Sequence, residues 1–271
     1  MAATRTQSAP AADRVLTVLE LLSESRFGLS LAELVDRTGL PKSSLHCLVV
    51  TLQRRGYLYR NERSGRYVFG LKLFSLADRA LGGLRIRDLA VPELRRLMSA
   101  TGLRVHFAIL ENDEAVLVAK LEPAGTSRLA TWIGKRMDLH CTGLGKALLA
   151  GLPPDAIDRI IRQRGLPRHN ENTLSSPRRL KEDLALTVNR GFAVDDEEDE
   201  IGFRCVGAPV FSGPGAPVAA LSLSGTTEQI TRDNLDRLGR MARKTAAAIG
   251  KILSGVESRA DAVQCAAGLR P

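Results

Sequence analysis

The strongest constraint on the fold is the alternation of apolar and helix-breaking residues in the first 56 positions. Leucine and valine recur at helical spacing in three short segments, residues 15–22, 31–35 and 45–52. Ser30, with Glu33 three residues later, predicts the start of the second segment. Gly39 suits the end of that helix and Pro41 the first turn of the next. The pattern therefore predicts three short helices, with a glycine-containing turn between the last two.

Two β-prone triplets follow, at residues 57–59 and 67–69, and a polar stretch with Ser64 and Gly65 separates them. This arrangement is typical of a hairpin. Two short helices joined by a tight turn and followed by a hairpin predict a winged helix-turn-helix over residues 13–70. A helical pattern then leads to Gly82 and Gly83, so we expect a linker helix over residues 71–84.

The remaining sequence has a mixed α/β character, and we expect one α/β domain over residues 85–255. Strands are expected near residues 105–110, 115–121, 128–133, 205–211 and 218–224. Helices are expected near residues 86–100, 142–150, 154–164, 176–190 and 231–253. Residues 1–12 are interpreted as a disordered tail and residues 256–271 as a flexible one.

Charge and cysteine content narrow the class of protein. The chain carries a formal charge of +9, and residues 1–83 hold 12 Lys and Arg against 7 Asp and Glu. Such an excess is compatible with nucleic acid. The four cysteines are far apart and have no histidine at zinc-finger spacing, so we expect no metal, disulfide or cofactor. Without a signal peptide or an apolar run of about 20 residues, a cytoplasmic protein that does not enter the membrane is expected.

The third helical segment and the hairpin are the candidate DNA-binding surface. The outward face of the helix carries small, weakly polar residues, which suit close approach to base edges, and arginines on the hairpin can lie along phosphates. The candidate DNA contacts are Lys42, Ser43, Ser44, His46, Cys47, Arg54, Arg63 and Arg66. The alternative is an ordinary amphipathic helix pair beside a solvated, arginine-rich hairpin.

These residues also carry a resemblance. The runs LAEL at 31–34 and TGLPKSSLH at 38–46 resemble the IclR (isocitrate lyase regulator) family of bacterial transcription factors. The second half agrees, with LHCTGLGKALLA at 139–150, RGFAVD at 190–195 and VAALSLSG at 218–225. The family often has Arg directly after the recognition-helix His, whereas this chain has Cys47. That departure leaves the inference of DNA binding intact but affects which operator sequence the protein is expected to prefer.

The resemblance implies an α+β protein with a winged helix-turn-helix, a dimerising linker helix and a GAF-like α/β effector-binding domain. It implies partners too: an operator in double-stranded DNA, a small organic-acid effector, and further copies of the chain in a homodimer or homotetramer. Carried over by position, the effector site is Leu129, Met137, Gly143, Leu144, Asp195, Phe203, Cys205, Ser222 and Ser224. Ser222 and Ser224 are two residues apart, so on a strand they share one face. They could equally be solvent-facing, with Cys205 in the core.

Other interpretations of the second half are disfavoured. The GLGK run at 143–146 lacks the residues of a phosphate-binding loop, although a helix starting near Thr142 would favour an anion. The acidic run at 195–200 is interpreted as a solvated loop rather than a metal site. No motif supports catalysis by Cys205 with His140 and Asp195, and we expect no enzyme. An architectural DNA-binding protein without a ligand stays open.

Overall fold

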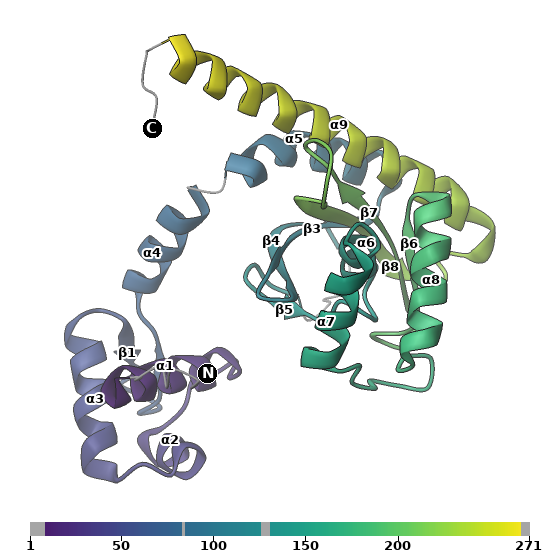
Figure 1. Cartoon of the computed structure of the whole chain (residues 1–271). Coiled ribbons are helices and arrows are strands. Elements are labelled where there is room, and N and C mark those ends of the chain that lie inside the picture. The colour runs from purple at the N-terminus through teal and green to yellow at the C-terminus, as the bar shows by residue number, and fades with distance from the viewer. Residues whose placement is uncertain (1–8, 83–84, 126–130, 267–271) are drawn as a thin grey trace, which may run out of the picture. The chain divides into compact units, whose positions relative to one another are not determined.

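The structure is a computed structural model that describes residues 9–82, 85–125 and 131–266 (Figure 1). The chain divides into two compact units, residues 1–83 and 84–271. Within the described ranges, every helix is too short or too polar to cross a membrane.

The first unit is a helix-turn-helix with a two-stranded antiparallel hairpin. Its elements are α1 (Pro10–Ser23), α2 (Leu31–Thr38), α3 (Lys42–Arg54), β1 (Leu58–Arg60), β2 (Tyr67–Phe69) and α4 (Leu71–Gly82). The expected capping box is present, since the Ser30 amide donates to Glu33 Oε2 at 2.7 Å and the Ser30 side chain accepts from the Glu33 amide. Helix α1 begins at Pro10, so the last residues of the expected N-terminal tail are helical.

The core of this unit explains why the three helices and the hairpin stay together. Val18 from α1, Leu34 from α2 and Val49 from α3 are all completely buried. Leu58 and Tyr67 come from the two hairpin strands and join the same cluster. Burial of these side chains fixes α3 against α2 and leaves the opposite face of α3 exposed.

The second unit is one curled antiparallel sheet covered by helices on both faces (Figure 1). The strand order is β5-β4-β3-β8-β7-β6. The strands are β3 (Arg104–Glu111), β4 (Glu114–Leu121), β5 (Arg136–Met137), β6 (Ala193–Asp196), β7 (Phe203–Val210) and β8 (Ala219–Thr226). The helices are α5 (Arg85–Thr101), α6 (Gly143–Ala150), α7 (Pro154–Arg164), α8 (Pro177–Arg190) and α9 (Arg232–Ala266).

Two elements differ from the sequence-based expectation. A strand was expected at 128–133, but residues 131–133 form none, 126–130 lie outside the described residues, and the nearest strand is β5. Helix α9 continues to Ala266, well past residue 255, where a flexible tail was expected. The apolar periodicity that predicted the end of the helix follows its buried residues as far as Leu253.

Alternating side chains on the strands separate two cores. Phe107 and Leu221 face α5 and α9, whereas Ala108 and Ala220 face α6, α7 and α8. Ser222 and Ser224 have the same parity as Ala220, so they lie on the α6 face, and both are buried. The face of the sheet under α6 therefore carries buried hydroxyl groups.

Two glycines allow α6 to begin directly on the sheet. A Cβ atom on Gly207 of β7 would lie 2.0 Å from the Gly143 carbonyl oxygen, a distance that no real structure tolerates. A Cβ atom on Gly143 would in turn lie 3.1 Å from Cys205 Cβ. The start of α6 and the middle of β7 are thus in backbone contact.

We expect Gly207→Ala to lower the free energy of unfolding by about 2 kcal/mol or more, because the methyl group must push α6 off the sheet. The matched control is Gly213→Ala, since nothing lies within 4 Å of a Cβ atom there. Urea unfolding of both variants measures the difference. Equal stability of the two variants would contradict the backbone contact described above.

Candidate functional site

The outward face of α3 presents five of the residues expected to contact DNA. Lys42, Ser43, His46, Cys47 and Arg54 are exposed. Ser44 is half-buried, because it lies next to the buried Leu45 on the side that turns toward the core. The exposed residues form a face with small and weakly polar side chains, and a cation at each end of the helix.

The two candidate arginines of the hairpin have different surroundings. Arg63 is exposed in the turn, where the Asn61 Oδ1 accepts the amides of Arg63 and Ser64. Arg66 instead points back into the unit: its Nη1 donates to the Gly28 carbonyl at 2.7 Å and its Nη2 lies 2.8 Å from Glu33 Oε1. Arg63 is therefore free to meet an external anion, while Arg66 holds the hairpin against α2.

Eight of the nine residues expected at an effector site line a single cavity of about 40 Å³ in the second unit. These eight are Met137, Gly143, Leu144, Asp195, Phe203, Cys205, Ser222 and Ser224. Leu129, the ninth, lies outside the described residues. We call this cavity the polar pocket. At this volume it has room for about one water molecule.

Strand pairing explains how residues far apart in the sequence meet in the polar pocket. Asp195 pairs with Cys205, and Cys205 pairs with Ser224, so these three form one row across β6, β7 and β8. Cys205 Sγ donates a hydrogen bond to Ser224 Oγ at 3.2 Å. The neighbouring row places Ser222 beside Gly207 on one side and His106 of β3 on the other.

The start of α6 adds hydrogen-bond donors to the polar pocket. Thr142 is the N-cap, and its hydroxyl accepts the Gly145 amide at 3.0 Å. Among the described residues, the amides of Gly143 and Leu144 donate no hydrogen bond. Free amides at a helix start favour an anion, because they add to the positive end of the helix dipole.

The protonation of the polar pocket depends mainly on Asp195. Burial and the nearby Glu198 carboxylate together raise the pKa of Asp195 to about 7, although the Glu198 amide and Lys146 act in the opposite sense. Burial also lowers the pKa of His106 to about 4, so its ring is neutral at pH 7. Below pH 7 the pocket therefore has a protonated carboxyl beside two hydroxyls and a neutral imidazole.

The acidic run is not a solvated loop throughout, as we had expected. Asp195 and Glu198 are buried, and Glu198 Oε1 accepts from Lys146 Nζ at 2.5 Å. Lys146 is completely buried in α6 and also lies 3.0 Å from Asp183 of α8. A buried ammonium group with two carboxylate partners is stable where an unpaired one would not be. The lysine thus joins α6, α8 and the acidic loop.

Sequence reasoning missed several residues of the polar pocket: His106, Thr131, Thr142, Asp199 and Glu200. His106 was detectable as the one histidine within an otherwise apolar strand pattern. The two acidic residues were hidden within a charged run, where composition favours solvent exposure.

The catalytic set that we disfavoured is not assembled. Cys205 lines the polar pocket, but His140 does not, and its Nε2 lies 2.9 Å from the Pro167 carbonyl oxygen. Burial raises the pKa of Cys205 well above its usual value, so the group stays a neutral thiol. A neutral thiol is a poor nucleophile, because the thiolate is the reactive form.

Comparison with known proteins agrees with both units. Residues 11–62 match the IclR helix-turn-helix domain, and residues 78–251 match the bacterial transcriptional regulator IclR C-terminal domain. The chain belongs to the IclR family. It is accordingly a transcriptional regulator with a DNA-binding helix-turn-helix, and its curated relatives are named as repressors and regulators, not as enzymes.

Individual IclR relatives resemble the whole chain. The transcriptional repressor IclR of Escherichia coli K12 is 34% identical over 235 residues, which cover 86% of each chain. The crystal structure of the Thermotoga maritima IclR has a TM-score of 0.76 and 29% identity, covering 90% of this chain and 99% of that one. An IclR homolog from Microbacterium hydrocarbonoxydans, solved with 4-hydroxybenzoate, shares the fold with a TM-score of 0.78 at 24% identity, over 90% and 99% of the two chains.

The raised pKa of Asp195 gives a testable pH dependence of stability. The folded carboxyl titrates near pH 7, but the unfolded one titrates near 3.8, so the folded state gains from protonation and loses stability as the pH rises between these values. Asp195→Asn has no charge to bury. Its stability relative to the native chain should therefore increase by about 2 kcal/mol between pH 5.5 and pH 8.

Urea unfolding at the two pH values measures this change. Asp36→Asn, at an exposed position of α2, is the control and should show the same difference from the native chain at both pH values. A stability gain for Asp195→Asn that does not grow with pH would show that the carboxyl is ionised throughout.

Proposed function

We propose that this IclR-family regulator binds an operator through α3 and the hairpin, and that a small carboxylate-bearing metabolite in the polar pocket modulates that binding. The observation that carries the proposal is the polar pocket: the buried hydroxyls of β8, the Asp195 carboxyl of β6 and the free amides of α6 converge there although they come from three separate elements. The protein would act as a homodimer or homotetramer, which presents two or more helix-turn-helix units to one operator.

The DNA half of the proposal divides the contacts into two classes. The α3 residues Ser43 and His46 would meet base edges, since they lie on the exposed face near the helix start. Arg63 and Lys42 would meet phosphates, together with Arg54. Ser44, Cys47 and Arg66 complete the proposed surface, with Arg66 contributing mainly through its ion pair with Glu33.

The effector half depends on complementarity between a carboxylate and the polar pocket. The amides of Gly143 and Leu144 would bind the anion, and Ser222 and Ser224 would donate hydrogen bonds from the sheet. Protonated Asp195 can also donate, whereas ionised Asp195 would repel the ligand. Met137 and Phe203, with Leu129, would cover an aliphatic or aromatic body. The 4-hydroxybenzoate bound by the Microbacterium homolog is a ligand of this class and hence a suitable first probe.

Arg63→Ala should weaken binding to all DNA equally and reduce the slope of log K against log salt by about one, because one phosphate contact is lost. His46→Ala should instead lose about 1–3 kcal/mol on a specific site and little on scrambled DNA. The specific site is a duplex selected by the purified full chain from a random-sequence pool. Fluorescence anisotropy over a salt series measures the affinity of each of the two variants for the selected site and for scrambled DNA.

Arg14→Ala, on the exposed side of α1, is the matched control for loss of one positive charge. Arg66→Ala is a less informative variant, because it also breaks the ion pair with Glu33. If Arg63→Ala and His46→Ala shift both DNAs by the same factor, the proposed division between phosphate and base contacts is wrong.

Ser222→Ala should leave DNA affinity unchanged without ligand and lower the affinity for a carboxylate effector by about 10-fold or more, since a hydrogen bond to a charged group is lost. A panel of aromatic and aliphatic carboxylates, beginning with 4-hydroxybenzoate, is screened by thermal shift and by release of the selected DNA. Ser99→Ala, exposed on α5, is the control.

A ligand response that Ser222→Ala retains in full would refute the pocket assignment. The absence of a response to any carboxylate would favour an architectural role.

A further inference from the structure

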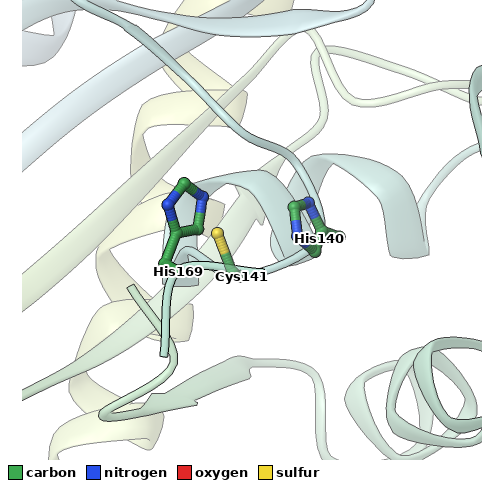
Figure 2. A group of neighbouring side chains, drawn as sticks. All are labelled: His140, Cys141 and His169. Atoms are coloured by element: carbon green, nitrogen blue, oxygen red, sulfur yellow. The ribbon is translucent and has the colours of Figure 1, made fainter. Parts of the chain in front are cut away.

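A group of metal-binding side chains lies beside the polar pocket without lining it. His140 and Cys141 directly precede the N-cap of α6, and His169 comes from the segment between α7 and α8 (Figure 2). One ring nitrogen of each histidine and the Cys141 sulfur all lie within 4.8 Å of one another. Their spacing in the sequence hides this group, because two complete helices, α6 and α7, lie between Cys141 and His169.

The surroundings of the two histidines resemble the support that metal-bound histidines receive. His140 Nε2 lies 2.9 Å from the Pro167 carbonyl oxygen, and His169 Nε2 lies 2.9 Å from Asp138 Oδ2. A histidine that binds a metal through one nitrogen commonly donates the other N–H to a carbonyl or carboxylate, which fixes the ring.

The local charge favours a cation. Asp138 Oδ2 lies 2.9 Å from His169 Nε2, so one carboxylate lies directly beside the three donors. A neighbouring carboxylate attracts a divalent cation more strongly than the isolated neutral ligands would.

We propose that His140, Cys141 and His169 form a Zn²⁺ site, with Asp138 supporting His169 from outside the ligand set. Two imidazole nitrogens and one thiolate, with water in the fourth position, are a tetrahedral donor set that Zn²⁺ accepts, and ligand atoms in such a site lie about 3.6 Å apart. The group must therefore contract by about 1 Å, which the exposed His169 can supply by side-chain rotation. On binding, the Cys141 S–H bond breaks, the sulfur bonds to the metal, and the proton goes to solvent.

The position of the site gives it a regulatory consequence. The metal would tie the segment between α7 and α8 to residues 138–141, which lead directly into the α6 start. Thr142 is next to Cys141, caps α6 and lines the polar pocket. Metal occupancy would thus stiffen the wall that carries the Gly143 and Leu144 amides.

The first test is Zn²⁺ titration of the metal-free full chain in competition with a chromogenic chelator. We expect one Zn²⁺ per chain, and at least about a 10-fold loss of affinity in His169→Ala, which changes an exposed side chain. The control is the double variant His46→Ala with Cys47→Ala, because these neighbours on α3 are an exposed His and Cys that could also capture metal. Retained affinity in His169→Ala, or loss of affinity in the control, would overturn the proposal.

The second test identifies the sulfur ligand. Co²⁺ in place of Zn²⁺ should give a thiolate-to-metal charge-transfer band, which Cys141→Ser abolishes and Cys205→Ser retains. Circular dichroism confirms that each variant is folded, and His169→Asn should weaken the same band if Cys141→Ser does not fold. A band that disappears with Cys205 instead would place the metal in the polar pocket and refute the site, as would the absence of any band.

Discussion

The second unit depends on the backbone contact between Gly143 and Gly207. Because neither residue has a side chain, the first turn of α6 lies on β7 at a distance that any larger residue would prevent. The contact places free helix amides directly over the row formed by Asp195, Cys205 and Ser224. Without it, the hydroxyls of β8 and the amides of α6 would be too far apart to meet one small ligand.

Lys146, three residues further along the same helix, also holds α6 in place. Its ammonium group is completely inaccessible to solvent and pairs with Glu198 and Asp183, so α6 is joined to the acidic loop and to α8 by charges that water cannot screen. Removing the lysine would leave the buried Glu198 without its cationic partner, and Asp183 would keep only Arg190, 3.8 Å away. The loop that carries Asp195 and Glu198 is therefore a fixed part of the domain.

The sequence predicted most of the architecture, because helix caps and apolar periodicity are local signals. The capping box at Ser30, the hairpin and the parity of Ser222 and Ser224 are confirmed. The residues of the polar pocket were predicted from the family resemblance. Sequence periodicity cannot bring together residues as far apart in the chain as Met137 and Asp195. Two kinds of feature were out of reach: charges that are buried because they have distant partners, such as Lys146 and Glu198, and the approach of His169 to Cys141, which only tertiary packing produces.

The small volume of the polar pocket, about 40 Å³, has a consequence for how fast and how tightly any metabolite can bind. If a ligand of ten or so heavy atoms binds in this pocket, side chains must first move outward, and the competent conformation would be a minority state of the free protein. The observed dissociation constant is then the intrinsic one divided by the fraction of open molecules. At high ligand concentration the association rate becomes limited by the opening step. A substitution that loosens the lining would then lower the apparent dissociation constant of the metabolite without adding a contact.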